Sequence, residues 1–337
     1  MKTDNILLDH GSGGRISHNL ISDIMLPIFD NPILSQLHDG AIIDIEGMRL
    51  AFSTDTFTVD PIFFPGGHIG DLAINGTVND IAMCGAMPIY ISIGLIIEEG
   101  FSILDLEKIL KGMHVAAEKA RVTVVTGDTK VVPRGSADKI FINTSGIGLM
   151  PGNVDISSHK ALPGDKIILS GTVADHGISV LLQREGINFD SPVISDTAPL
   201  NFMVEAMLAT TKKDIHVLRD PTRGGVGTSL NEIAEKSNVG MIISEEKIPI
   251  KDEVASVCEL LGFDPLYIAN EGKLLAFVGP DPAEEILATL KENEYGKDAV
   301  IIGEVISDNP GKVIMKTRIG GTRIIDMLSG EQFPRIC

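Results

Sequence analysis

Apolar residues in the first half of the chain recur at two spacings, one typical of strands and one typical of helices. Short runs in which apolar residues alternate with polar ones, or stand together, predict strands at Ala41–Ile45, Arg49–Thr54, Ile89–Ile97, Val122–Thr126 and Lys139–Met150. Apolar residues at helical spacing predict a helix over Asp105–Ala120. Two further helices are expected over Ser17–Phe29 and over Gly66–Cys84, where Gly85 gives a stop signal.

The alternation of strands and helices begins again after Pro151-Gly152-Asn153. The elements predicted there are strand Lys166–Ser170, helix Asp175–Arg184, helix Ala198–Thr211, strand His216–Arg219, helix Val226–Lys236, strand Met241–Ser244, helix Asp252–Leu261, strand Lys273–Val278, helix Pro282–Lys291, strand Ala299–Val305 and a hairpin over Lys312–Asp326. A chain of 337 residues suits two domains better than one. We therefore predict an α+β fold with domains at residues 1–153 and 154–328 and a mobile tail over 329–337.

The charge balance excludes some classes of function. The chain has 28 Lys+Arg and 46 Asp+Glu, a net charge of −18, which argues against binding to nucleic acid or to an anionic membrane surface. Glycine or charge interrupts each apolar run before it is long enough to span a membrane. The N-terminus lacks the apolar run of a signal peptide, and the three cysteines form no CxxC pair. We expect a cytoplasmic, reduced protein.

Several acidic residues stand at polar or glycine-flanked junctions: Asp39, Asp55, Asp80, Asp128 and Asp220. Val122–Thr126 is interpreted as a short buried strand that runs into a turn at Gly127–Lys130, which carries an acid and a base. Acids in such places suit Mg²⁺, which bridges phosphate oxygens and offsets the negative charge of the protein. The chain has no G-x-x-x-x-G-K-[ST] motif, so a nucleotide enzyme would bind phosphate in another way. Acids at loop ends also serve solubility, and this alternative stays open.

Polar residues interrupt the apolar helix predicted over Gly66–Cys84. Asp71, Asn75 and Asn79 share one face, with Asp80 beside them. A solvated outer face would more often carry Glu, Lys or Arg, so a functional face and a plain surface face are both considered. Two glycine-rich segments, at residues 9–15 and 220–225, offer backbone amides to an anion, although the first is also typical of an ordinary N-terminal loop.

The chain ends in a cysteine, Cys337. The segment from Gly330 to this residue would reach roughly 24 Å if extended. A thiol on such a tether can visit a site on another protein and return to a site on its own. The simpler interpretation is an incidental exposed thiol. A prenylation signal is excluded because it needs the cysteine fourth from the end.

The chain resembles the HypE family of hydrogenase expression/formation proteins over its whole length. The matching segments, in order, are His10–Gly14, Ser53–Thr56, Asn75–Asp80 through Cys84–Ala86, Thr126–Val132, Arg219–Gly225, Asn270–Gly272 and Pro334–Cys337. Each segment alone is weak, but the ordered set with the terminal cysteine is specific. The broader superfamily includes aminoimidazole ribonucleotide synthetase, selenophosphate synthetase and thiamine-monophosphate kinase.

The resemblance implies a fold and a reaction. Members have two α+β domains and form homodimers in which N-terminal strands build a barrel, with ATP near the interface. The carbamoyltransferase HypF places a carbamoyl group on the terminal cysteine, and the HypE protein dehydrates this thiocarbamate to a thiocyanate with ATP. The cyanide then passes to iron on the HypC–HypD complex. The resemblance thus names a maturation factor of nickel–iron hydrogenases.

The resemblance also suggests roles for residues, with Cys337 as the carrier of the reacting group. Asp55, Asp80, Asp128 and Asp220 are candidates for the Mg²⁺ and phosphate region, with Asp39 a further metal candidate. Lys130 would orient the phosphoryl or carbamoyl group and Glu271 would remove a proton, and these two roles can be exchanged. The expected nucleotide contacts are Thr54, Asn75 and Thr129, and His10–Gly14 is expected to close over phosphates.

Two other classes of function remain open from the sequence. A superfamily kinase or synthetase would act on a diffusible small molecule and would not need Cys337. A non-catalytic scaffold would carry the modified cysteine between partners and would not hydrolyse ATP. The thiocarbamate dehydratase is the function that uses both the acidic junctions and the terminal thiol.

Overall fold

The computed structural model describes residues 5–29, 31–187, 192–328, 330 and 333–337. The first half contains short helical turns η1 (Leu8–Gly11), α1 (Arg15–Leu20), the π-helical η2 (Ile21–Met25), α2 (Leu26–Phe29) and η3 (Leu34–Gln36). They are followed by β1 (Ala41–Ile45), β2 (Met48–Phe57), β3 (Phe63–Phe64), β4 (Gly67–His68), α3 (Ile69–Met83), β5 (Met87–Glu98), α4 (Ile103–Ala120), β6 (Thr123–Val132) and β7 (Ile140–Leu149). The predicted helices and strands of this half are present.

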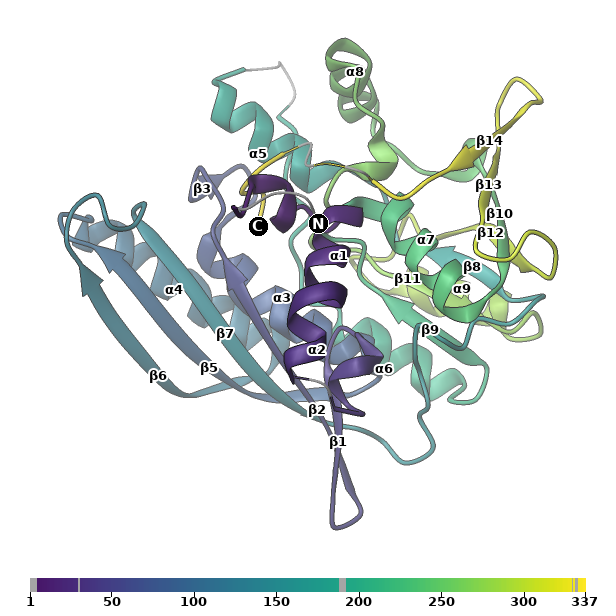
Figure 1. Cartoon of the computed structure of the whole chain (residues 1–337), viewed down its shortest axis with the longest axis horizontal. Coiled ribbons are helices and arrows are strands. Elements are labelled where there is room, and N and C mark those ends of the chain that lie inside the picture. The colour runs from purple at the N-terminus through teal and green to yellow at the C-terminus, as the bar shows by residue number, and fades with distance from the viewer. Residues whose placement is uncertain (1–4, 30, 188–191, 329, 331–332) are drawn as a thin grey trace.

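A five-stranded sheet in the order β1-β2-β7-β5-β6 forms the first domain (Figure 1). All its strand pairs are antiparallel except β5–β6. Helices α3 and α4 pack together against this sheet. Helix α3 begins at Ile69 because His68 caps it: the His68 Nδ1 accepts the Gly70 N–H at 3.0 Å, and Asp71 accepts the His68 N–H at 2.9 Å. The glycines before His68 therefore lie outside the helix.

Two of the predicted strand ends are wrong. Strand β2 continues to Phe57, so Asp55 lies inside a strand and not at its end. The predicted turn at Gly127–Lys130 is part of the continuous strand β6, which pairs with β5 as far as Val132. Strand β6 is also exposed along almost its whole length, not buried, because it is the edge strand of the sheet.

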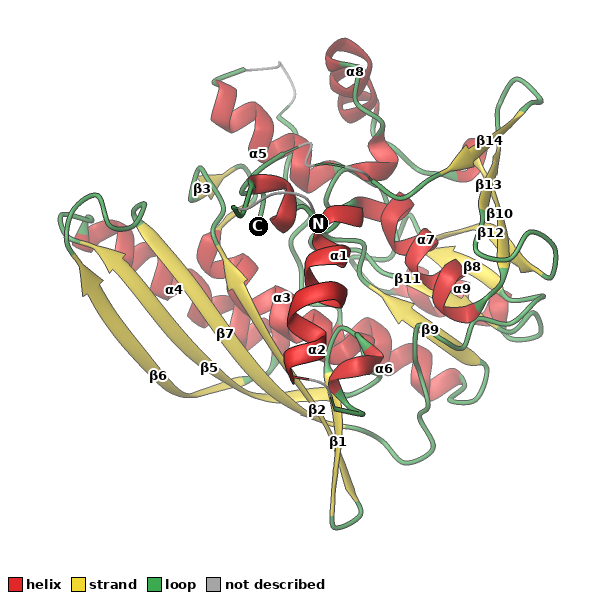
Figure 2. Ribbon diagram, in the orientation of Figure 1, coloured by secondary structure: helices red, strands yellow, loops and turns green. Residues whose placement is uncertain are grey.

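The helices and strands predicted in the second half are present, and the helices surround a seven-stranded sheet (Figure 2). Its elements are β8 (Lys166–Leu169), α5 (Asp175–Glu185), α6 (Asn201–Thr210), β9 (Ile215–Arg219), α7 (Gly225–Ser237), β10 (Gly240–Ser244), η4 (Glu245–Lys247), α8 (Asp252–Leu261), η5 (Pro265–Tyr267), β11 (Leu275–Val278), α9 (Ala283–Glu292), β12 (Val300–Ile306), β13 (Val313–Lys316) and β14 (Thr322–Ile325). The strand order is β14-β13-β10-β12-β8-β11-β9. The hairpin predicted over Lys312–Asp326 is the antiparallel pair β13–β14.

One of the hydrophobic clusters spans both halves of the molecule. A single buried cluster joins Ala51 and Ile81 of the first sheet and its helix to Leu200, Met207 and Ala276 of the second half. Helix α6 packs on α3 on one side and on α9 on the other. The two sheets are therefore held by continuous apolar packing between α3 and α6 as well as by the chain that links them. The limits of the domains at 153 and 154 remain a prediction.

In the described residues, no helix is both long enough and apolar enough to cross a membrane.

Candidate active site

Three of the predicted aspartates, Asp55, Asp80 and Asp220, gather with Glu271 where the two domains meet. Asp55 comes from β2 and Asp80 from the end of α3, and a Cβ atom placed on Gly76 of α3 would stand 3.8 Å from Asp55 Oδ2. Asp220 follows β9, and Glu271 precedes β11. Both side chains are buried, with 6% and 4% exposed. The second domain thus adds two carboxylates to the two that the first domain supplies.

The acids of this cluster perturb one another. Burial, with the charges of Asp220, Asp55 and Asp39, raises the pKa of Asp80 well above its ordinary value. Burial, and then Asp39, raises the pKa of Asp220 to about 7, while Arg219 opposes the shift. Burial also raises the pKa of Asp55. A site with this much negative charge favours a bound cation or proton.

Asp39 has a partner of its own. Its carboxylate accepts a hydrogen bond from Arg219 Nη1, and Arg219 Nη2 lies 3.1 Å from Glu232 Oε2. Asp39 also contributes its backbone carbonyl to Ser53 Oγ, whose hydroxyl lies 2.6 Å from Asp80 Oδ2. The structure therefore places Asp39 beside the cluster as an ion-pair partner of Arg219.

The Asn270-Glu271-Gly272 loop is fixed on both sides of Glu271. Asn270 Nδ2 donates to the Pro221 carbonyl at 2.9 Å, and Asn270 Oδ1 accepts the Ala174 N–H at 2.8 Å. The Glu271 N–H donates to Asp196 Oδ1 at 3.1 Å. Gly272 is needed because a Cβ atom there would lie 1.8 Å from the Asp196 carbonyl oxygen. The backbone of Glu271 is thus fixed by hydrogen bonds, while its side-chain Oε1 makes none within the described residues.

The Glu271 carboxyl group is buried with one oxygen left without a hydrogen bond, because no partner among the described residues reaches Oε1. Burial, with the charges of Asp196, Asp220 and Asp55, raises the pKa of Glu271 well above its ordinary value. A carboxyl group in this environment binds a proton more tightly than one in water.

The polar face of α3 meets the loop before α6. Asn79, 1% exposed, donates to the carbonyls of Ala198 at 3.0 Å and Glu271 at 3.2 Å, and accepts the Leu200 N–H at 2.8 Å. Asn75 Nδ2 donates to Thr197 Oγ1 at 3.2 Å, and its buried Oδ1 has no partner in the described part of the chain. The face is buried at the domain boundary, so it is not a plain solvated surface.

The other predicted residues lie away from this cluster within one chain. Asp128, Thr129 and Lys130 are exposed on β6, where Lys130 Nζ lies 2.6 Å from Asp128 Oδ2. Asp55 pairs with Thr144 of β7, and the pairing continues through β5 to β6, so three strand spacings, about 14 Å, separate β2 from β6 at this level. This separation keeps the Lys130 side chain from the cluster of its own chain.

Thr54 faces the opposite side of β2 from its neighbours. It is exposed, and its hydroxyl lies 2.9 Å from Ser145 Oγ of β7. The alternation of a strand puts Ser53 and Asp55 toward α3 and Thr54 away from it. Thr54 thus lies on the sheet face opposite to the acidic cluster.

The final residues of the tail lie between the domains, as Figure 1 shows for the C-terminus. A backbone oxygen of Cys337 accepts the Thr58 N–H at 3.0 Å, and the Arg335 carbonyl accepts the Asp60 N–H at 3.1 Å. Ile336 is 5% exposed and packs into the core of the first domain. Cys337 itself is half-buried. The tail therefore pairs with the chain just beyond β2, three residues past Asp55.

Arg223 connects the tail to the acidic cluster. The charge of Cys337 raises the pKa of Arg223 most, burial opposes the shift, and Asp55 and Glu271 raise it further. The loop that was expected to cover phosphates lies against this arginine: Arg223 Nη1 donates to the Gly11 carbonyl at 3.4 Å. Gly13, at φ +77°, approaches so closely that a Cβ atom there would lie 2.8 Å from Arg223 Cβ. The negative charges of Cys337, Asp55 and Glu271 thus all favour the charged form of the Arg223 guanidinium.

The carboxylates do not form a complete metal site. In the ranges that the structure covers, no group of three or more His, Cys, Asp or Glu side chains converges well enough to hold a metal ion. Mg²⁺ commonly uses one or two protein carboxylates and completes its shell with water and phosphate oxygens. The neighbouring carboxyl groups of Asp55, Asp80 and Asp220, each with a raised pKa, fit that kind of binding.

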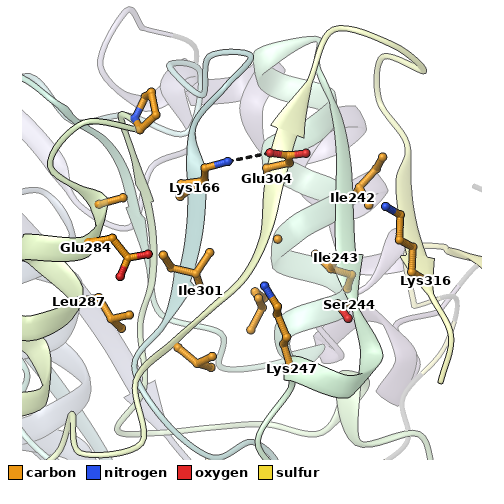
Figure 3. Close-up of a pocket in the computed structure, with 15 residues that line it drawn as sticks. Lys166, Ile242, Ile243, Ser244, Lys247, Glu284, Leu287, Ile301, Glu304 and Lys316 are labelled. Atoms are coloured by element: carbon orange, nitrogen blue, oxygen red, sulfur yellow. Dashed lines mark hydrogen bonds and ion pairs between the residues drawn. The ribbon is translucent and has the colours of Figure 1, made fainter.

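A separate cavity of about 540 Å³ lies in the second half of the chain, where residues of β10, β12 and α9 line it (Figure 3). Its floor includes Ile242 and Ile301, and Lys166 at its rim lies 2.7 Å from Glu304. None of the residues that line it belongs to the predicted site. Its size therefore does not identify it as the place of the chemistry.

Three residues of the site were not predicted from the sequence. Arg223 stands in the glycine turn Asp220–Gly225, and its place beside two glycines was the available signal. Asp196 and His176 carry no motif, and only the fold shows that Asp196 holds Glu271 and that His176 contacts the tail. Such residues act through long-range contacts that have no local pattern.

Comparison with known proteins agrees with this arrangement. Residues 37–150 match the N-terminal domain of AIR synthase related proteins, and residues 163–316 match their C-terminal domain. The carbamoyl dehydratase HypE of Rhizobium leguminosarum bv. viciae is 50% identical over 330 residues, 98% of this chain and 94% of its own. A crystal structure of HypE in complex with ATP is 52% identical and covers 99% of this chain and 100% of its own, with a TM-score of 0.83.

A crystal structure of a HypE–HypF complex is also similar. Its matching chain is 48% identical, with a TM-score of 0.88 over 92% of this chain and 99% of its own. The identity extends over nearly the whole chain and both domains, and the acidic cluster and the glycine turn lie inside the matched domains. The chain therefore belongs to the HypE family of hydrogenase-maturation carbamoyl dehydratases, within the AIR synthase related proteins.

Proposed function

We propose that this chain dehydrates an S-carbamoyl group on its own Cys337 to a thiocyanate with ATP, and so supplies the cyanide ligands of the iron in nickel–iron hydrogenases. One observation carries the proposal: the backbone oxygen of Cys337 accepts the Thr58 N–H at 3.0 Å, three residues beyond Asp55, so the terminal residue is docked beside the acidic cluster. A terminal thiol that merely decorated the surface would have no reason to lie beside a buried acidic cluster between two domains.

The reaction balances with one ATP. The thiocarbamate oxygen takes the γ-phosphoryl group while the nitrogen loses one proton, which gives ADP and an O-phosphorylated imidate. The C–O bond then breaks, phosphate leaves, and the nitrogen loses its second proton to complete the C≡N bond. Phosphorylation is needed because an amide oxygen is a poor leaving group. Positioning and charge stabilisation are what a protein contributes to such a transfer.

Glu271 is the proposed proton acceptor. It is buried, it has no partner for Oε1 within the described residues, and burial raises its pKa well above the ordinary value, so it holds a proton more tightly than an exposed carboxylate does. Lys130 is the proposed orienting cation for the phosphoryl or carbamoyl group. The two roles can be exchanged. Cys337 is the carrier of the reacting group.

The acidic cluster is the proposed place for Mg²⁺. Asp55, Asp80 and Asp220 would hold it, with Asp128 and Asp39 as further candidates. The ion would neutralise phosphate charge in a protein that has a net charge of −18. Thr54, Asn75 and Thr129 are the proposed nucleotide contacts, and His10–Gly14, which lies against Arg223, would cover the phosphates.

We also propose a homodimer built on the first sheet. Its face away from α3 exposes large apolar side chains, among them Tyr90, Val125 and Ile147, of which 49%, 56% and 40% are exposed. Strand β6 adds an unpaired edge. Within one chain, about 14 Å separates the strand of Lys130 from the strand of Asp55. In the proposed dimer, the Asp128–Lys130 segment of the second copy would serve the site of the first.

HypF is the proposed carbamoyl donor and the HypC–HypD complex the proposed cyanide acceptor. The complex of a close relative with HypF supports the first partner. A tail that ends between the domains must leave that place to enter a partner's site, and the proposed tether of residues 329–337 would allow this. Cytoplasmic location is part of the same proposal.

Intact mass spectrometry tests the reaction. Cyanate adds to a thiol to form an S-carbamoyl group, so the chain can be carbamoylated without its partner and then given ATP and Mg²⁺. The expected product is lighter by one water than the carbamoylated chain, with one ADP formed. Cys337→Ala should bind nucleotide and show no loss of water. If the carbamoylated wild-type chain keeps its mass, the proposal fails. Turnover of a small molecule by Cys337→Ala would indicate a kinase or synthetase instead.

A further inference from the structure

The described end of the tail is held by side chains of α5. His176 Nε2 lies 2.8 Å from the Ile336 carbonyl oxygen. Arg184, two turns later on the same helix, donates from Nη2 to the Arg335 carbonyl at 2.9 Å and from Nε to the Asp60 carbonyl at 2.8 Å. Both residues bind backbone atoms of the tail, so they recognise its course and not its side chains.

Hydrogen-bond directions fix the tautomer of His176. The Ile336 carbonyl can only accept, so Nε2 must carry the proton. The Thr197 N–H donates to Ser195 Oγ at 3.2 Å, and the Ser195 hydroxyl is then free to donate to His176 Nδ1 at 2.8 Å. The ring is fully buried, and burial lowers the pKa of His176. A neutral, oriented imidazole therefore faces the tail.

The segment that orients His176 also holds the active site. Ser195 binds His176, Asp196 accepts the Glu271 N–H at 3.1 Å, and Thr197 accepts from Asn75 at 3.2 Å. Consecutive residues thus contact the tail-binding histidine, the proposed base and a proposed nucleotide contact. Displacement of the tail would leave the buried Nε2–H of His176 without its acceptor. Because Ser195 contacts this ring, the 195–197 segment links the tail to Glu271 and Asn75.

We propose that His176 and Arg184 are positioning residues that hold the tail, and with it Cys337, in the dehydration site. Their hydrogen bonds to the Ile336 and Arg335 carbonyls are the contacts that break when the thiol leaves. This inference rests on the proposed function for its chemical purpose, but the docking contacts themselves can be tested without it. The two residues should oppose carbamoyl acceptance and favour dehydration, because one step needs the tail out and the other needs it in.

Alkylation of Cys337 measures docking directly. Iodoacetamide is added to the unmodified chain without ATP or partner, and the terminal peptide is followed by mass spectrometry. His176→Phe and Arg184→Gln should raise the alkylation rate about threefold to tenfold, the change in an equilibrium constant that loss of a net hydrogen bond gives. Cys84 and Cys258, both buried, report global unfolding in the same samples.

Two control variants separate docking from a general loss of structure. Ser179→Ala removes a hydrogen bond of 3.1 Å from α5 to the Pro65 carbonyl, across the same boundary but not to the tail, and should leave the rate unchanged. His176→Gln keeps an N–H donor for the Ile336 carbonyl and should restore most of the slow rate. If Arg184→Gln melts like wild type and Cys337 is alkylated no faster, the proposal is overturned, whether or not His176→Phe folds.

The rates of carbamoyl acceptance and of dehydration give a second, independent test. In the carbamoylated chain with ATP and Mg²⁺, Arg184→Gln should lose water about threefold to tenfold more slowly, while its acceptance of a carbamoyl group from the carbamoyltransferase is unchanged or faster. A parallel fall of both rates would show a merely structural role and overturn the assignment. If even the wild-type chain loses no water, the proposed function fails, while the alkylation result on docking stands.

Discussion

Asn79 offers a direct test of how the domains are joined. Its side chain is 1% exposed and makes three hydrogen bonds, to the carbonyls of Ala198 and Glu271 and from the Leu200 N–H. Asn79→Ala leaves those three buried backbone groups without their partner. At about 1 kcal/mol for each net bond, the free energy of unfolding should fall by about 3 kcal/mol.

The expected change in melting temperature follows from the size of the chain. The unfolding entropy of 337 residues is about 0.7 kcal/mol per kelvin, so a loss of about 3 kcal/mol lowers Tm by about 4 °C. Circular dichroism at the helical band is a suitable assay. The same variant should also slow dehydration, because the Glu271 backbone loses a contact.

Asn75, one turn earlier on α3, is the matched control. Within the described part of the chain its side chain makes a single hydrogen bond, of 3.2 Å to Thr197, so Asn75→Ala should lower Tm by about 1 °C. Equal shifts in the two variants would refute the assignment of the domain contact to Asn79. A shift below about 1 °C for Asn79→Ala would show that the three bonds are replaced at little cost.

Three further outcomes are expected. Glu271→Gln should slow water loss from the carbamoylated chain by about 10²- to 10⁴-fold, as removal of a general base does, while carbamoyl acceptance continues; intact mass follows both. EDTA should stop ADP formation, and added Mg²⁺ should restore it, as a coupled ADP assay would show. The hydrogen bond to Asp165 raises the pKa of His216, so this pair stabilises the fold below about pH 6.5 and loses its effect as pH rises through the folded-state value. The difference in Tm between wild type and His216→Gln should therefore be larger at pH 6 than at pH 8.5; an equal difference at both values would contradict it.

Most elements of the fold follow from local patterns in the sequence. Helix α4 is an example: apolar residues at helical spacing predict it, the Ser102 hydroxyl accepts the Asp105 N–H at its start, and Arg121 at φ +53° ends it. Strand β6 shows the limit. Gly127 suggested a turn, but pairing with β5 carries the strand through it to Val132. Register with a neighbouring strand is a long-range property that one glycine does not reveal.

The site is predictable to a similar extent. Asp55, Asp80 and Asp220 were predicted at junctions, the resemblance added Glu271, and the fold brings these four together. The sequence also suggested that Lys130 lies with them, yet β6 is an outer strand and carries Lys130 away. Sequence spacing shows which residues stand near turns, but the order of strands in the sheet decides which turns meet.

The core that runs between the two domains limits how this molecule can move. Ile81, Leu200 and Ala276 belong to one buried cluster, so opening the boundary like a hinge would expose packed apolar side chains from both sides. Many ATP-dependent enzymes close one lobe over another, but here that motion would cost part of the core itself. The two halves should therefore melt together. Substrate exchange should require movement of the short terminal segments and not of the two halves.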